Sequence, residues 1–174
     1  NCIDVSSRNT KAYKEYSNGS IVLLKKEVDE ITNLTKVMLG NVDFFDMIRE
    51  KNNQYEVPMI KEIKGVMWKG KADIVNEHVL IDLKTTSDIS KFKWSARDYN
   101  YDSQAYIYEQ LFGKPLFFLV VDKQTQALGM FEPTPEFLEK GERKVEQAIS
   151  VYNQFFSKDA EEDIETYYIN EQLN

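Results

Sequence analysis

The chain has 174 residues, a hydrophobic content of 42% and a net charge of −7, from 22 Lys and Arg against 29 Asp and Glu. The length fits one domain able to bury a core, and the charge excludes a protein that coats nucleic acid through bulk positive charge, although it permits a local basic groove. The single Cys2 excludes an intrachain disulfide, and no apolar run approaches the ~20 residues of a membrane span. We therefore expect a soluble cytoplasmic protein without a membrane partner.

The chain gives no sign of internal division. It contains no repeat, no linker rich in Pro, Gly or Ser, and no low-complexity tract. It begins at Asn1 rather than Met, and its first residues do not have the shape of a signal peptide. We therefore predict one domain over residues 1–174, and we expect it to lack an N-terminal part of a longer protein.

Helical spacing dominates the first third of the chain. Over residues 21–39 apolar side chains recur at every third or fourth position, which predicts an amphipathic helix whose apolar stripe lies in the core. This stripe comprises Leu24, Val28, Ile31, Leu34 and Met38. A shorter helix is expected over residues 43–51.

From Glu56 the spacing of apolar residues changes to one typical of β-strands. Residues 56–75 are rich in β-branched side chains and are interrupted at Lys64 and Gly65 by a turn signal. Residues 78–85 give another short strand. We predict three strands in a meander.

A helix, two strands and a last helix complete the predicted order. Residues 98–112 have helical spacing and end before Gly113, a common helix stop. Residues 115–122 form an apolar strand of the kind found inside a sheet, and residues 127–133 are its expected partner. A final helix is expected over residues 134–157. The order of helices, three strands, helix, strand, strand and helix predicts an α/β fold.

Two carboxylates, Asp73 and Asp82, lie in neighbouring apolar segments of the stretch KGKADIVNEHVLIDLKTT. Buried carboxylates are costly unless a cation meets them, and Mg²⁺ prefers oxygen ligands and typically uses one or two protein carboxylates. Because side chains alternate along a strand, Asp82 and Lys84 share a face. A metal and an ammonium side by side suit phosphodiester cleavage. The alternative is an exposed Asp–Lys pair on an edge strand.

These features together resemble the PD-(D/E)XK nuclease superfamily, whose αβββαβ core carries an Asp on one strand and a (D/E)-X-K triplet on the next. Here these are Asp73 and the triplet Asp82-Leu83-Lys84. The segments GVMWKGKADIV, LIDLKTT and YDSQAYIY are most similar to RecE-type (exonuclease VIII-like) prophage exonucleases of the RecB-like branch. The last segment carries a Gln-x-x-x-Tyr pattern at Gln104 and Tyr108. The resemblance implies a central mixed sheet flanked by helices.

The resemblance also implies roles for single residues. The expected catalytic set is Asp73, Asp82, Lys84, Gln104 and Tyr108, and the expected metal-binding set is Asp73, Asp82, Leu83 and Glu56. Mg²⁺ is the implied cofactor, and Mn²⁺ can substitute for it. Gln104 and Tyr108 share a helical face, from which they can bond phosphate or orient Lys84 and the metal ligands. Two alternatives stay open: that Tyr108 belongs to the core, and that Glu56 is a solvated side chain at a strand entry.

The superfamily usually carries a His on an upstream helix that completes the metal site. The only His in this chain is His78, which lies in the turn between the two motif strands and cannot be that residue.

Basic and aromatic residues cluster around the motifs. The expected DNA-binding residues are Lys69, Lys71, Lys91, Lys93, Trp94 and Arg97. For residues 91–97 we favour a local electrostatic track for phosphate binding and base stacking. For residues 61–71 a solvated face is an equally open interpretation.

The expected function is a metal-dependent deoxyribonuclease. The resemblance implies an exonuclease that resects linear duplex DNA for phage-type recombination in a bacterial or phage-infected cell. It also implies a homo-oligomeric ring that threads DNA, and a single-strand annealing protein as partner. Two alternatives stay open: a single-strand-preferring or endonucleolytic RecB-like nuclease, and a non-catalytic DNA- or protein-binding module on the nuclease fold.

Overall fold

A five-stranded mixed sheet forms the centre of the computed structural model, which describes residues 1–160 and 162–172. Its strands lie in sequence order and are β3 Gln54–Ile63, β4 Val66–Val75, β5 Leu80–Thr86, β6 Leu116–Asp122 and β7 Leu128–Phe131. The first three strands form an antiparallel meander, β5 and β6 are parallel, and β6 and β7 are antiparallel. A parallel pair needs a long crossover, and this crossover contains two helices.

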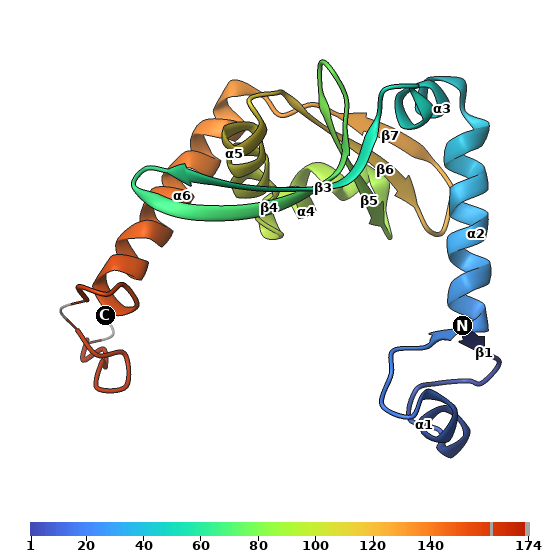
Figure 1. Ribbon diagram of the computed structural model, residues 1–174, viewed down its shortest axis with the longest axis horizontal. Coiled ribbons are helices and arrows are strands. Elements are labelled where there is room, and N and C mark those ends of the chain that lie inside the picture. The colour runs from blue at the N-terminus through green and yellow to red at the C-terminus, as the bar shows by residue number, and fades with distance from the viewer. Residues whose placement is uncertain (161, 173–174) are drawn as a thin grey trace.

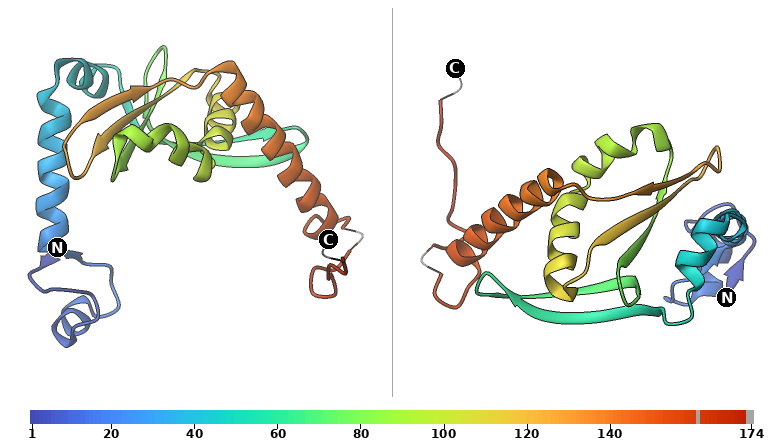
Figure 2. Two further views of the ribbon diagram at one scale, coloured as in Figure 1. Left: turned by 180° about the vertical axis from the view of Figure 1, so that it is seen from behind. Right: turned by 90° about the horizontal axis from the view of Figure 1, so that it is seen from above.

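The helices lie around this sheet and at both of its ends. They are α1 Lys11–Ser17, α2 Lys25–Gly40, α3 Val42–Arg49, α4 Phe92–Asp98, α5 Tyr101–Phe112 and α6 Pro135–Phe155. A 3₁₀ turn, η1 Ile89–Lys91, precedes α4, and two short strands, β1 Cys2–Ile3 and β2 Leu23–Leu24, pair in parallel. In Figure 1, and from behind in Figure 2, α2 and α6 extend from opposite ends of the sheet, which gives the molecule the outline of an arch.

Helices cover both faces of the sheet, which confirms the predicted α/β class. On one face α4 and α5 pack against Leu80, Phe118 and Val120. On the other face α2 and α3 pack against a second cluster that contains Leu119 and Val121. Neighbouring residues of β6 therefore enter opposite cores, because strand side chains alternate. This burial on both faces explains why the segment 115–122 is almost entirely apolar.

The predicted strands and the final helix are confirmed. The turn between β3 and β4 has left-handed backbone angles at Lys64 (φ 52°) and Gly65 (φ 78°). Helix α5 ends at Gly113, also left-handed with φ 69°. Thr134 caps α6 by accepting a hydrogen bond from the Phe137 N–H. Within residues 1–160 and 162–172, no helix has both the length and the apolarity that crossing a membrane needs.

Two details of the helix predictions are wrong. The helix expected over residues 98–112 begins only at Tyr101, because Asn100 adopts a left-handed conformation (φ 55°) that separates it from α4, a helix that was not predicted. Along α2, Leu34 and Met38 are buried, but Ile31 is 54% exposed. Leu24 is buried before the helix begins, in β2. Helix α2 thus contacts the sheet through its C-terminal half, and its N-terminal half extends beyond the sheet (Figure 1).

Candidate active site

Asp82 is a buried carboxylate in the middle strand of the sheet. It is 4% exposed, and β5 has two strands on either side. The interpretation as an exposed pair on an edge strand is therefore wrong. Its neighbour Leu80 belongs to the core beneath α4 and α5 and Ile81 to the opposite core, so Asp82 faces α5.

Gln104 of α5 reaches this carboxylate. Its amide nitrogen donates a hydrogen bond to Asp82 Oδ1 at 2.5 Å. The helix is held against the sheet by Ala105 and Leu111, which are 0% and 3% exposed. A rigid helix thus fixes one oxygen of the Asp82 side chain.

Lys84 lies beside the other oxygen of Asp82. Its Nζ is 2.7 Å from Asp82 Oδ2 and 4.5 Å from the centroid of the Tyr101 ring. An aromatic face attracts an ammonium group, so Tyr101 helps to hold Lys84 next to Asp82. Tyr101 is not among the site residues predicted from the sequence. Its position three residues before Gln104, on the same side of a helix, was the available signal.

The charge balance around Asp82 is incomplete. Burial raises the pKa of the Asp82 carboxyl above its ordinary value, and the charge of Asp73 acts in the same direction. Lys84 and Gln104 lower that pKa but do not outweigh the burial. Asp82 Oδ2 accepts no hydrogen bond among the described residues, and the contact made at this oxygen is the ion pair with Lys84. A further cation at this oxygen would complete the environment.

Asp73 lies on β4, next to the triplet. The backbone ladder between β4 and β5 ends at the pair Ile74–Ile81. Beyond this pair the Leu83 N–H donates to Asp73 Oδ2 at 2.8 Å instead of to a backbone carbonyl. The carboxylates of Asp73 and Asp82 therefore belong to adjacent strands at the point where regular pairing stops.

Glu56 lies opposite Asp73 on the edge strand β3. The pairs Tyr55–Ile74 and Val57–Ala72 flank this position. Glu56 has a left-handed backbone (φ 54°), a conformation that costs roughly 1–3 kcal/mol in a residue other than glycine and that often occurs at functional sites. Its carboxylate forms an ion pair with Lys71, which raises the pKa of Lys71.

The described residues contain no cluster of three or more His, Cys, Asp or Glu side chains with metal-binding spacing. Two carboxylates nevertheless suffice for Mg²⁺ when water and substrate supply the remaining oxygens. Asp73 and Asp82 are hard oxygen ligands on adjacent strands, and Asp82 Oδ2 is buried and accepts no hydrogen bond among the described residues. These residues therefore fit a divalent cation. Leu83, which is 39% exposed and bonds Asp73 through its N–H, adjoins them.

Tyr108 contacts the strand rather than Asp82 or Lys84. Its hydroxyl donates to the Lys71 carbonyl at 2.9 Å, and its ring packs on the core. Gly70 permits this close approach, because a Cβ there would lie 2.8 Å from Leu111 and 3.1 Å from Tyr108. His78 is exposed and lies in the β4–β5 turn, as predicted.

The expected DNA-binding residues occupy two elements. Lys69 and Lys71 are exposed on β4. Lys93, Trp94 and Arg97 are exposed on α4, and Trp94 is 62% exposed, which excludes it from the core. Lys91 precedes α4 and pairs with Asp88 at 3.1 Å.

The chain matches one protein family and is similar to solved structures. A family described as "PDDEXK-like domain of unknown function (DUF3799)" matches residues 4–165. No curated protein matches the chain. A solved structure from Eubacterium rectale, described as a "Putative exonuclease", is similar with a TM-score of 0.68 and 19% identity over 94% of this chain and 70% of that chain. This is a similarity of fold. The structure of SSO0001, with a TM-score of 0.44 and 20% identity over 74% of this chain and 59% of that chain, is too distant to support an argument.

Proposed function

Because the chain belongs to the DUF3799 family of PDDEXK-like domains, we propose that it is a metal-dependent deoxyribonuclease that hydrolyses phosphodiester bonds. The observation that carries this proposal is the environment of Asp82. This buried carboxylate is held by Gln104 at 2.5 Å, lies 2.7 Å from the ammonium of Lys84, and keeps one oxygen without a hydrogen-bond partner.

Asp73 and Asp82 would hold Mg²⁺ or Mn²⁺, with Leu83 and Glu56 as additional candidates. When bound, such an ion polarises the phosphate and lowers the pKa of an attacking water. Gln104 keeps Asp82 in one orientation. Lys84, steadied by the face of Tyr101, can donate a hydrogen bond to a phosphate oxygen or to the attacking water, and its charge opposes the negative charge that develops in the transition state. Tyr108 positions β4 by bonding the Lys71 carbonyl.

The finer proposal is a RecE-type exonuclease that resects linear duplex DNA during phage-type recombination. The motifs around Asp73, Asp82 and Gln104 support it, as does the "exonuclease" in the description of the similar E. rectale structure. We further propose that residues 1–174 act as one nuclease domain, that the protein assembles into a ring, and that it cooperates with a single-strand annealing protein in the cytoplasm. The ring and the annealing protein rest on the sequence resemblance alone.

Digestion of linear and covalently closed duplex DNA, each with Mg²⁺, Mn²⁺ or EDTA, tests the proposal. We expect the metals to support degradation of the linear form and EDTA to stop it, while the closed circle survives. Cutting of circles as fast as linear DNA would contradict an exonuclease and favour the endonucleolytic alternative. A chain that binds metal but cuts neither form would favour the non-catalytic module.

A further inference from the structure

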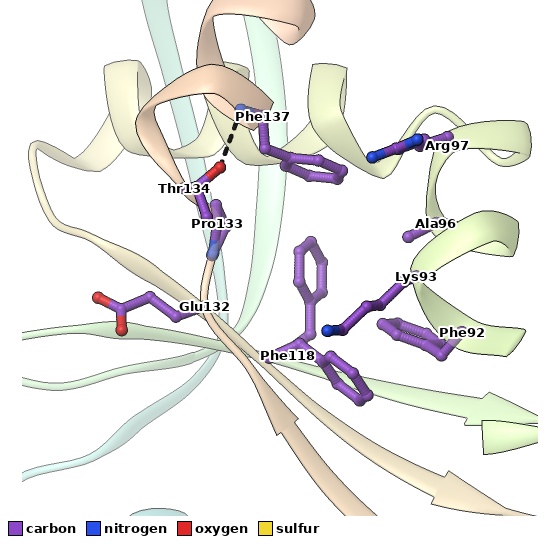
Figure 3. Close-up of a pocket in the computed structure, with 10 residues that line it drawn as sticks. Phe92, Lys93, Ala96, Arg97, Phe118, Glu132, Pro133, Thr134 and Phe137 are labelled. Atoms are coloured by element: carbon purple, nitrogen blue, oxygen red, sulfur yellow. Dashed lines mark hydrogen bonds between the residues drawn. The ribbon is translucent and has the colours of Figure 1, made fainter. Parts of the chain in front are cut away.

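A pocket of about 230 Å³ lies between α4, the strands β6 and β7, and the start of α6 (Figure 3). Its walls are mainly aromatic: Phe92, Phe118, Phe131 and Phe137 line it, with Ala96 and Pro133. Phe92 and Phe118 are 3% and 2% exposed, so the floor of the pocket is made of tightly packed side chains. None of the residues proposed to hold a metal lines this pocket.

The pocket adjoins the candidate active site through the ring of Phe118. Phe118 lies opposite Asp82 in the register of β5 and β6. Its ring stacks on Tyr101 with 5.6 Å between centroids, and the ammonium of Lys84 lies 4.5 Å from the centroid of the Tyr101 ring and 6.0 Å from that of Phe118. Phe118 therefore lines the pocket and also lies within reach of the Lys84 ammonium.

The mouth of the pocket is positively charged. Lys93 and Arg97 lie one helical turn apart on α4, and in Figure 3 Lys93 extends toward the middle of the pocket and Arg97 toward Phe137. In the described part of the chain neither of them forms a salt bridge, whereas Lys91 pairs with Asp88. Glu132 also lines the rim, but Figure 3 shows it pointing away from the aromatic rings.

The positive charge continues from the pocket along α6. A neighbouring groove of about 290 Å³ is lined by Arg97, Lys140, Arg143, Lys144, Asp102 and Gln147. Asp102 is compensated by Lys144 at 2.8 Å. Arg97 belongs to both the pocket and the groove, so the two form one continuous surface on a chain whose net charge is −7.

A nucleotide has an aromatic base and a negatively charged phosphate. The pocket offers aromatic walls for the first, and Lys93 and Arg97 offer positive charge for the second. Bases stack on aromatic side chains whatever their sequence, and Lys and Arg side chains bind the phosphates. The pocket is smaller than the roughly 300–1,000 Å³ of sites that enclose whole drug-sized ligands, so it has room for one ring system but not for a base pair. We propose that the pocket holds one unpaired nucleobase of a nucleic-acid strand, and that the groove along α6 holds phosphates of the same strand.

This inference rests on the proposed nuclease function and narrows its substrate. A base can enter the pocket only after it leaves its partner, so the strand that reaches Lys84 carries at least one unpaired nucleotide beside the scissile phosphate. Unpairing costs a few kcal/mol in a duplex and nothing in a single strand. The site therefore favours single-stranded or frayed ends over internal duplex.

Binding in EDTA tests the inference without hydrolysis. Fluorescence anisotropy would compare the 174-residue chain with a labelled oligothymidine and with an abasic strand of equal length. We expect oligothymidine to bind at least about five-fold more tightly, the effect of one base–aromatic stack. Phe137→Ala should bring this ratio close to one without changing abasic binding, and Phe137→Trp should preserve it. Arg143→Ala should weaken both strands equally and reduce the salt dependence of binding.

Phe156→Ala is the matched control, because Phe156 is a 57% exposed aromatic directly after the end of α6 and lies outside the pocket. This variant should keep the wild-type ratio of affinities for oligothymidine and the abasic strand. Equal binding of the two strands by the wild-type chain, or a ratio that survives Phe137→Ala, would overturn the inference. Either result leaves the nuclease proposal intact, since hydrolysis with Mg²⁺ is measured separately. Base discrimination without hydrolysis would contradict the nuclease proposal alone.

Discussion

Gln104 donates a hydrogen bond of 2.5 Å to Oδ1 of Asp82, and this contact joins helix α5 to the middle strand of the sheet. The crossover between the parallel strands β5 and β6 carries α5 back over the sheet, so residues 22 positions apart meet. A buried carboxylate without a donor is costly, so the amide both stabilises Asp82 and fixes its direction.

Removing that amide should destabilise the protein. We expect Gln104→Ala to lower the free energy of unfolding by about 1–3 kcal/mol, because it leaves a buried carboxylate oxygen without its donor. Urea unfolding monitored by circular dichroism measures the change. Gln110→Ala makes the same change of side chain at an exposed position of α5. Its free energy of unfolding should stay within about 0.5 kcal/mol of the wild-type value. Equal effects of the two substitutions would show that the Gln104–Asp82 bond contributes nothing specific.

Divalent metal should stabilise the folded chain through the two aspartates. A ligand that binds only the folded state, at about 100 times its Kd, adds about 2.7 kcal/mol to the free energy of unfolding. Thermal unfolding with and without Mg²⁺ or Mn²⁺ should show this rise in wild type and in Asp46→Asn, an exposed control on α3. Asp73→Asn and Asp82→Asn should each abolish it. A shift that persists in both variants would place the metal elsewhere.

The crossing of α5 and α6 should not tolerate a side chain at Gly141. A Cβ there would lie 2.1 Å from the carbonyl oxygen of Asp102, a backbone atom that cannot move freely. We expect Gly141→Ala to lower the free energy of unfolding by at least about 1–3 kcal/mol, despite the better helix propensity of Ala. Gly40, at the end of α2, has nothing within 4 Å of such a Cβ. Gly40→Ala should be neutral or slightly stabilising, and a similar loss in both variants would contradict the close crossing.

Asp122 should contribute to stability in a pH-dependent way. The backbone N–H of Thr125, with those of Ile89 and Gln124, holds the pKa of this carboxyl below its ordinary value, although burial acts in the opposite direction. A lowered folded-state pKa stabilises the fold above the unfolded-state value of about 4, and this contribution is lost as pH falls through the folded-state pKa.

Asp122→Asn should therefore differ most from wild type near neutral pH, and the difference should shrink below about pH 4. Urea unfolding over a series of pH values from neutral to acid measures it. A difference between the two proteins that is constant over the whole range would contradict the role given to the Asp122 charge.

The strands were predictable because their local patterns are strong. The uninterrupted apolar run of β6 indicates a strand buried on both faces, and strand alternation alone places Asp82 and Lys84 on one face. Helix α4 was not predicted, because seven residues with two buried positions, Phe92 and Ala96, give a weak pattern. Its formation depends on packing against the core rather than on its own sequence.

The candidate site was predictable in its motifs but not in its contacts. The stack of Tyr101 under Lys84, the left-handed backbone of Glu56 and its pairing with Lys71 all depend on how separate elements meet. The groove that joins Arg97 to Arg143 combines two helices more than 40 positions apart in the sequence. No periodicity within one segment reveals such a surface.

The most direct test of the proposed active site is the single-turnover rate at which Lys84→Ala hydrolyses linear duplex DNA at saturating Mg²⁺. The ammonium of Lys84 is proposed to act on the transition state, so we expect the rate to fall by at least about 100-fold. The variant should keep the metal-induced rise in thermal stability and its affinity for DNA, which shows that the fold and the metal site remain. Hydrolysis by Lys84→Ala at the wild-type rate would contradict the account.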